Sequence, residues 1–314
     1  MRIEFDPTLV EQAVVHRVYG DRKLEAQLHR KIDRLYELPP GRERDSQFIA
    51  AYADLFGELD LAGPLTDLLA ELPIIANHTA RCLIRESTRA KRDKAELLIK
   101  RGTADPTPED RRLIVEVSVA SLLEPSQLEI RMRREFHHVA DMLDDHFDYQ
   151  REEIDGLPSR QNLVRDRYRV LWDVYIEGRL DRQGLGDGVN VQRLAGMLTQ
   201  VFNLDDPSVA SSFFGQVYAS ERLTHSDLFR WSQSPELSSN EEVETDAGSM
   251  GEPGTACPLC GFPTFVWYDF SLALSENARR TICNEHPGWS AAQGACRQCV
   301  EIYATSSVCE PLAS

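Results

Sequence analysis

The sequence predicts an α+β protein whose mostly helical N-terminal domain, 1–231, contains a small antiparallel sheet packed on a long helix. Three observations support this. A β-branched, alternating segment at 111–119 runs directly into a helical pattern, other helical patterns fill the chain up to 231, and six of the seven cysteines lie within 257–314. The cysteines predict a small, separate metal-binding domain. Between the two domains, 232–256 is rich in Ser, Glu and Gly and predicts an acidic, flexible linker.

Length and composition narrow the class of protein. The chain has 314 residues, 42% of them hydrophobic, which is enough for at least one packed core. Its formal net charge of −16 disfavours nonspecific nucleic-acid binding, because Lys and Arg drive that binding by displacing counterions from phosphates. The sequence shows neither a signal-peptide pattern nor an apolar run long enough to cross a membrane. We therefore expect a cytoplasmic protein with no membrane partner.

Helical patterns dominate the first part of the chain. The charged segment 8–38 predicts a helix that ends at the Pro-Pro-Gly sequence of 39–41. A second helix is predicted over 45–59, where apolar residues recur in steps of three and four, and a shorter one over 64–72.

Strands are predicted on both sides of residue 105. The segment 79–102 fits either one long helix or two strands around a basic turn, and the alternation of Cys82 and Ile84 with arginines favours a hairpin. The next segment, 111–119, is clearer, because β-branched residues dominate and apolar positions alternate. The two together predict the small antiparallel sheet.

The long helix follows this strand directly. It is predicted over 127–150, with Pro125 in its first turn. Its apolar stripe is Leu128, Met132, Phe136, Val139, Leu143 and Phe147. A further helix is expected over 162–180, and two or three more over 189–231.

The strongest chemical signal is a pair of Cys-x-x-Cys motifs, CPLCG at 257–261 and CRQC at 296–299. Thiolates are favoured ligands of Zn²⁺, which takes four of them tetrahedrally, and two such turns supply that set. Four protein ligands leave no open position for a substrate, so the zinc is expected to be structural. The expected ligands are Cys257, Cys260, Cys296 and Cys299.

An alternative ligand set uses the Cys-x-x-His pair of Cys283 and His286 together with the first motif. We favour the four-cysteine set because it uses two matched turns. A knuckle, intervening strands and a terminal helix that carries the second motif resemble treble-clef and zinc-ribbon modules. The resemblance covers 257–314 and leaves the bound partner open.

The long helix carries a second chemical pattern. The segment REFHH at 134–138 resembles the His-Glu-x-x-His helix of zincin-type metallopeptidases, with Arg134 in place of the first His. Zincins also place this helix after a small sheet, the order expected here. The resemblance implies that Glu135 corresponds to the catalytic base and His138 to a metal ligand.

A third ligand of this second zinc site would come from a later helix, where Asp173 and Glu177 are one turn apart. The arginine at the first ligand position departs from the zincin pattern, because a guanidinium has no lone pair to offer zinc. Three interpretations follow: His137 or Asp141 replaces the missing ligand, the fold persists without metal, or the domain is an unrelated helical one.

Two functions are compatible with these patterns. The first is a zincin-like scaffold with an altered or lost catalytic centre, whose structural zinc module acts in protein–protein interaction or regulation. The alternative is an active metal-dependent hydrolase, a peptidase, with Glu135 as base and His138 as ligand of a second zinc ion. Nucleic-acid binding by the zinc module is disfavoured, because 257–314 contains only three arginines and no lysine.

Overall fold

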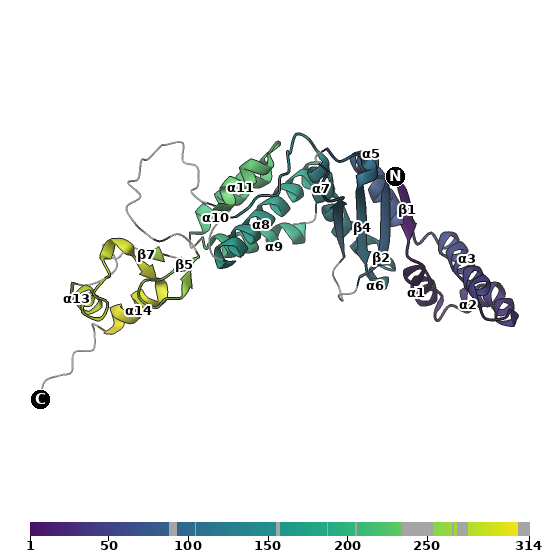
Figure 1. The fold of residues 1–314 in the computed structure, drawn as a ribbon, viewed down its shortest axis with the longest axis horizontal. Helices are drawn as coiled ribbons and strands as arrows, with labels where there is room; N and C mark the ends of the chain where they lie inside the picture. Colours follow the sequence, from purple (N-terminus) through teal and green to yellow (C-terminus); the bar gives the residue numbers. More distant parts are fainter. Residues whose placement is uncertain are drawn as a thin grey trace, which may run out of the picture. The chain divides into compact units, whose positions relative to one another are not determined.

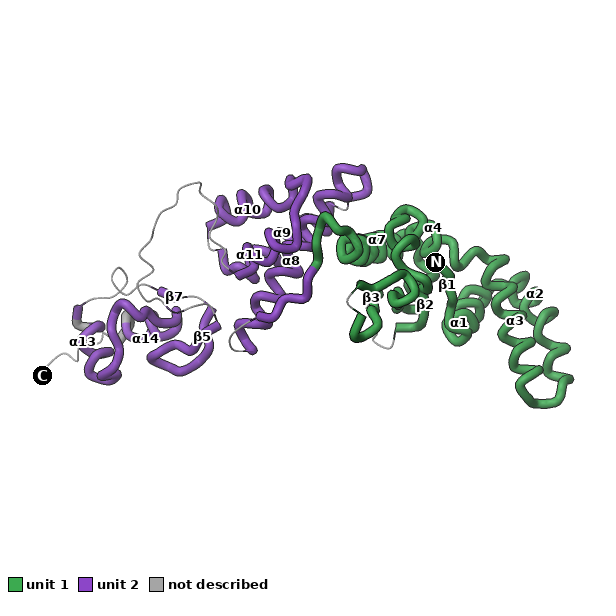
Figure 2. The backbone as a smooth tube through the Cα atoms, turned by 45° about the horizontal axis from the view of Figure 1, so that its top comes forward, with its two compact units in different colours: residues 1–149 green, residues 150–314 purple. Residues whose placement is uncertain are grey.

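The structure is a computed structural model that describes 1–87, 93–103, 105–154, 158–186, 188–204, 206–233, 251, 254–265, 267–268 and 276–306. It forms two compact units, the N-terminal unit (1–149) and the C-terminal unit (150–314) (Figure 2). The fold combines α and β structure, as predicted, and helices predominate (Figure 1). The predicted division around 232–256 stays a prediction, because most of that segment lies outside the described residues. Within the described ranges, no helix is long and apolar enough to cross a membrane.

The N-terminal unit contains one four-stranded sheet. Its strands are β1 (Arg2–Phe5), β2 (Arg81–Glu86), β3 (Lys94–Ile99) and β4 (Arg111–Val117), in the order β1-β2-β4-β3. The β1–β2 and β2–β4 pairs are parallel, and β3 runs antiparallel to β4 at the edge.

This topology corrects the predicted sheet, which is mixed rather than wholly antiparallel. Both strands expected within 79–102 form, but they do not pair as a hairpin, because β4 lies between them. The most apolar strand takes the central position: Leu113, Val115 and Val117 of β4 are fully buried. β3 instead exposes about half of Leu98 and Ile99, which fits an edge position.

The first helices of the N-terminal unit also differ from the prediction. The segment expected as one helix over 8–38 is divided by Gly20, whose φ of 83° no helix accommodates. The Asp21 carboxylate then accepts hydrogen bonds from the N–H groups of Lys23 and Leu24 and starts the next helix. The elements here are α1 (Pro7–Val18), α2 (Arg22–Ile32) and a 3₁₀ helix, η1 (Asp33–Glu37). The strand β1 before them was not predicted.

The remaining helices pack around the sheet. They are α3 (Arg42–Glu58), α4 (Gly63–Glu71), α5 (Pro73–His78), α6 (Val119–Leu122) and α7 (Pro125–Leu143), with a short 3₁₀ helix, η2 (Pro108–Asp110). The long helix α7 ends earlier than predicted, but its entire predicted apolar stripe is buried. Residues of that stripe share one hydrophobic core with β2, β4 and α1.

The C-terminal unit begins with four helices, α8 (Pro158–Arg182), α9 (Gly188–Phe202), α10 (Pro207–Ala219) and α11 (His225–Gln233). This confirms the helices predicted over 162–180 and 189–231. α8 and α10 approach so closely that a Cβ atom at Gly178 would overlap the carbonyl oxygen of Tyr218. A glycine is therefore required at that contact.

The last part of this unit, which we name the cysteine module (254–306), consists of short elements. Its strands form two antiparallel pairs, β5 (Thr255–Ala256) with β6 (Pro263–Thr264) and β7 (Trp267–Tyr268) with β8 (Ala295–Cys296). Its helices are α13 (Glu276–Glu285), η3 (Ala291–Gln293) and α14 (Arg297–Ser306).

Candidate metal centre

The first Cys-x-x-Cys motif lies on the turn between β5 and β6. The Cys257 N–H donates to the Phe262 carbonyl at 2.8 Å, and the Gly261 N–H donates to the Cys257 carbonyl at 2.8 Å, so the chain folds back on itself within this segment. Gly261 has a φ of 72°, a left-handed conformation that glycine adopts without strain. The turn thus places two thiols on the same side of the hairpin.

The second motif lies at the start of α14. Cys296 ends β8, and Cys299 lies in the first turn of the helix. The Cys296 N–H lies 3.4 Å from the Cys257 sulfur, and the Cys299 N–H lies 3.5 Å from the Cys296 sulfur. N–H groups that point at sulfur favour the thiolate form, but at Cys296 burial outweighs the Cys299 N–H and raises the pKa.

The four sulfur atoms meet in one cluster, and each lies within 4.8 Å of the others. The sulfurs of Cys257 and Cys299 are 4.0 Å apart, and those of Cys260 and Cys296 are 3.8 Å apart. Four sulfurs placed tetrahedrally at about 2.3 Å from a zinc ion would be about 3.8 Å apart. A disulfide would require about 2.05 Å. The structure therefore brings the four predicted cysteines together at the spacing of a metal site.

The thiols do not share one electrostatic environment. Burial raises the pKa of Cys257, but N–H groups of Cys296, Cys260 and Leu259 outweigh it and bring that pKa to about 7. Burial raises the pKa of Cys299, and its neighbouring cysteines raise it further. Thiolates this close repel one another, and Cys257 and Cys299 are also buried, so a bound divalent cation would be needed to keep all four ionised.

Apolar contacts around the cluster are few. The small core of the cysteine module combines three of the cysteines with Ala278, Ile282, Trp289, Ala295 and Val300. The Trp289 indole N–H donates to the Gly294 carbonyl at 3.1 Å, so its polar atom is satisfied inside this core.

The alternative ligand pair lies elsewhere in the module. Cys283 is exposed on α13, outside the sulfur cluster. The His286 Nε2 atom lies 3.2 Å from the Tyr303 hydroxyl, which donates to the Glu285 carboxylate at 2.6 Å. The geometry thus joins the second Cys-x-x-Cys motif, and not the Cys-x-x-His pair, to the first motif.

The zincin-like residues of α7 lie within the N-terminal unit. One Glu135 oxygen lies 3.4 Å from the N–H of Ala95, so this carboxylate faces strand β3. His138 is half-buried on the same helix. In the described part of 1–149, no three His, Cys, Asp or Glu side chains converge as metal ligands.

The residues predicted to supply the third ligand of the second zinc site lie on α8 in the C-terminal unit. Asp173 is half-buried, and Glu177 is buried and accepts a hydrogen bond from the Asn190 amide. The Asn190 oxygen in turn accepts from the Arg193 guanidinium at 2.6 Å. A second metal site that uses His138 with these two carboxylates stays a prediction.

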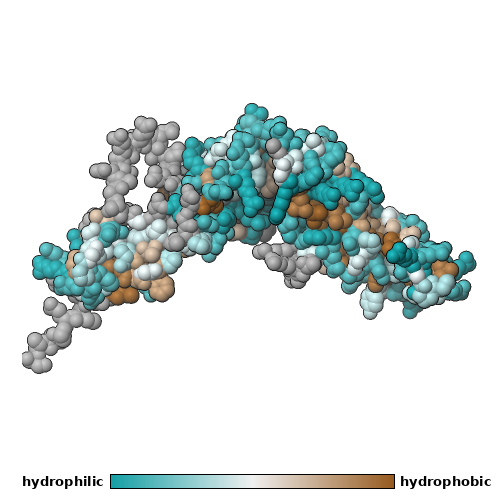
Figure 3. All heavy atoms as spheres, in the orientation of Figure 1, coloured by the Kyte–Doolittle hydropathy of each residue, from teal (hydrophilic) through white to brown (hydrophobic). Residues whose placement is uncertain are grey.

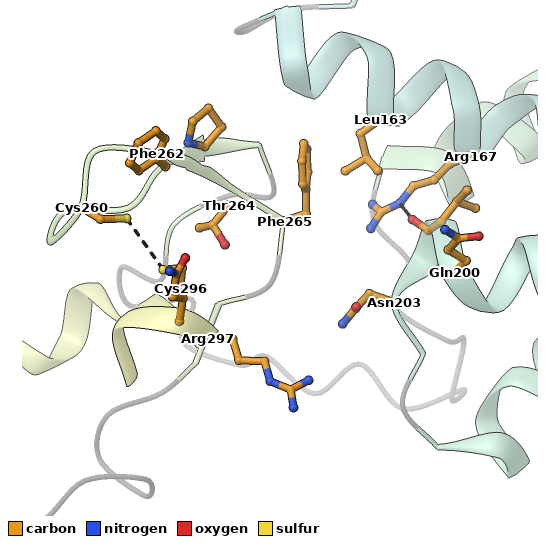
Figure 4. A pocket seen from close by; sticks show the side chains of 13 residues that line it. Leu163, Arg167, Gln200, Asn203, Cys260, Phe262, Thr264, Phe265, Cys296 and Arg297 are labelled. Atoms are coloured by element: carbon orange, nitrogen blue, oxygen red, sulfur yellow. Dashed lines mark hydrogen bonds between the residues drawn. The ribbon is translucent and has the colours of Figure 1, made fainter. Parts of the chain in front are cut away.

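A pocket of about 430 Å³ lies beside the sulfur cluster and was not predicted (Figure 4). Phe262 and Phe265 of the cysteine module and Leu163 and Arg167 of α8 contribute to its lining. Arg167 is almost fully buried and donates from Nε to the Val201 carbonyl at 3.0 Å, and burial lowers its pKa to about 10. The only sequence signal for the pocket is Phe262, which directly follows CPLCG, together with Phe265 three residues later.

Comparisons of the chain with known protein families, with curated proteins and with solved structures find no match.

Proposed function

We propose that this chain is a zinc-binding docking protein, in which one structural zinc ion holds the cysteine module in shape and the module binds a protein partner. The spacing of the four cysteine sulfurs carries the proposal, because distances of 3.8 and 4.0 Å fit a tetrahedral zinc site. Zinc is the expected metal because four thiolates in a tetrahedral arrangement favour it over the hard, oxygen-preferring cations.

A structural rather than catalytic role follows from the ligand set. All four positions of a tetrahedral ion would be filled by protein sulfur, which leaves none for water or substrate. The hairpin with the first motif and the helix start with the second are the arrangement expected of a treble-clef module. This likeness supports the resemblance seen in the sequence.

The docking surface is centred on Phe262 in the turn of the β5–β6 hairpin, with Phe265 directly after β6. Phe262 is 74% exposed, and Phe265 and Ile302 are also exposed. On the face that Figure 3 shows, apolar side chains gather on part of the cysteine module. Exposed aromatic residues beside a pocket are typical anchors of protein interfaces. A protein partner fits better than nucleic acid, because the module is poor in basic residues.

The N-terminal unit supports the scaffold role better than the catalytic one. The Glu135 carboxylate lies against a backbone N–H of β3, and Arg134 stands where zincins have a metal ligand. We therefore propose that this unit is a zincin-like scaffold without a catalytic metal.

Metal analysis of the full-length protein tests the zinc site. We expect one zinc ion per chain, and we expect Cys260→Ser to lower this content strongly. The matched control is Cys283→Ser, which removes an exposed cysteine outside the cluster and should retain the metal. Equal zinc loss in both variants, or a metal-free wild type, would refute the site.

A peptide-library selection against the full-length protein tests the docking role. Peptides that bind the cysteine module should be lost on Phe262→Ala and after zinc chelation. The control Leu98→Ala removes an exposed apolar side chain from the N-terminal unit, and this variant should bind the peptides normally. Selected peptides that tolerate both Phe262→Ala and chelation would contradict docking at this hairpin.

A further inference from the structure

A second pocket, of about 350 Å³, lies in the N-terminal unit and belongs to neither of the sites considered so far. It forms where α1, η1 and the first half of α3 meet. Its lining residues are Pro7, Glu11, Tyr36, Asp45, Phe48, Ile49 and Tyr52. The volume lies within the range of small-molecule sites.

Three aromatic rings form part of this lining. Tyr36 and Phe48 make an edge-to-face pair with ring centroids 5.0 Å apart. Tyr52 is one helical turn after Phe48 on the same face of α3, and only 8% of its surface is exposed. Tyr36, in contrast, is 65% exposed, so the pocket combines a buried aromatic wall with an accessible one.

The charge of the pocket is negative. Glu11 and Asp45 supply two carboxylates, and none of the described lining residues is basic. Burial raises the pKa of Tyr52, and the nearby Glu11 carboxylate raises it further. Neither carboxylate belongs to a group of three metal-ligating side chains among the described residues, so the pocket does not have the composition of a metal site.

We propose that this pocket binds the alkylated ammonium group of a small organic cation. The faces of aromatic rings attract cations, and clusters of such rings recognise quaternary ammonium groups. A primary ammonium is strongly hydrated, and among the groups of this lining only the carboxylates and hydroxyls can replace its water, because ring faces offer no hydrogen-bond acceptor. A quaternary ammonium has no N–H groups to satisfy. The two carboxylates add an attraction that a neutral molecule of the same shape would not feel.

Three probes of graded chemistry test this proposal on the full-length protein by saturation-transfer NMR and calorimetry. Choline carries a quaternary ammonium, 3,3-dimethylbutan-1-ol is its neutral isostere, and ethanolamine has a primary ammonium. Choline is expected to bind at least about fivefold more tightly than either of the others. Equal binding of the neutral isostere, equal binding of ethanolamine, or no binding of choline would overturn the proposal.

Matched variants locate the binding. Tyr36→Leu removes one exposed ring of the pocket and should weaken choline binding roughly threefold to fivefold. Tyr19→Leu is the control, because Tyr19 is 85% exposed and lies outside the pocket. Glu11→Gln should weaken choline binding, and Glu43→Gln, on α3 outside the pocket, should not. Unchanged affinity in Tyr36→Leu, or equal losses in a variant and its control, would overturn this location.

Discussion

The core of the N-terminal unit draws buried side chains from helices and strands alike, whereas the core of the cysteine module contains three of the four clustered cysteines and a small set of apolar side chains. In the N-terminal unit, Phe136 of α7, Leu9 of α1 and Val115 of β4 are fully buried in one apolar cluster. Among the described residues of the cysteine module, a few buried side chains such as Ile282 and Trp289 accompany the sulfurs.

The contrast shows two ways to offset the conformational entropy that folding removes. The N-terminal unit is large enough to do so by burying apolar surface. The cysteine module has a small apolar core, so the zinc ion that we propose would contribute folding free energy directly. The two regions should therefore respond differently to metal removal and to loss of a core side chain.

Metal removal should give the largest difference. Structural zinc contributes on the order of 10 kcal/mol to the folding of small zinc modules. A chelator should therefore unfold α14 and the β5–β6 hairpin and leave β4 and α7 of the N-terminal unit folded. Hydrogen exchange followed by mass spectrometry measures both regions in one experiment. If chelation lowered the protection of β4 and α7, or left that of α14 unchanged, the proposed difference between the two regions would be wrong.

Truncation within the apolar core should have the opposite pattern. Phe136→Ala removes a fully buried ring and is expected to destabilise the N-terminal unit by about 3–5 kcal/mol. Exchange protection of β4 and α7 measures this loss, and the zinc content should not change. Leu98→Ala is the control, because Leu98 is 49% exposed at the edge of the sheet and should cost less than about 1 kcal/mol. Equal effects of the two changes would show that α7 is not packed as described.

Local sequence patterns predicted where helices and strands form better than they predicted which strands pair with one another. The apolar stripe of α7 and the strand β4 follow from residues close in sequence, and both formed as expected. The pairing of β2 and β3 depends on a competition among strands for the centre of the sheet. β4 lies between β2 and β3, and it is the most apolar of the strands. The hairpin predicted for 79–102 did not take into account that a later strand could pair between them.

The cysteine cluster was predictable because the Cys-x-x-Cys spacing itself indicates a metal site. Two Cys-x-x-Cys turns fix four sulfurs almost regardless of the structure between them. The pocket beside the cluster was not predictable in this way. It joins Phe262 of the hairpin to Leu163 and Arg167 of α8, and no local pattern signals a contact between residues so distant in sequence.

The N-terminal unit contains an ion pair whose contribution to stability depends on pH. The nearly buried Glu116 carboxylate of β4 accepts from Arg85 at 2.5 Å and lies 3.3 Å from the Lys94 ammonium. Burial alone would raise the pKa of Glu116, but its bonds to Arg85 and Lys94 lower it below the ordinary value of a glutamate. The stabilisation is therefore fully present above about pH 4.5 and is lost as the pH falls through the lower pKa of the folded state.

Glu116→Gln should accordingly destabilise the N-terminal unit by about 1–2 kcal/mol at pH 7. The difference from the wild type should shrink as the pH falls below about 4.5 and disappear below the lower pKa of the folded state, where the wild-type carboxylate is also neutral. Glu96→Gln is the matched control, because Glu96 bonds the same Lys94 but is half-exposed, so its effect should stay below about 1 kcal/mol. Exchange protection of β4 measured against pH checks both. A deficit in Glu116→Gln that persists unchanged at low pH would contradict this account.

The smallest expected effect lies at the start of α2, at the periphery of the apolar core. Asp21→Ala removes the carboxylate that accepts from the N–H groups of Lys23 and Leu24 and should cost about 1 kcal/mol. Asp21→Asn keeps a capping oxygen and should restore most of that loss. Protection of α2 should fall in the alanine variant, while that of α14 and the zinc content should stay unchanged if the cysteine module is held by the proposed zinc ion. A change in zinc content on Asp21→Ala would mean that the two regions do not fold independently.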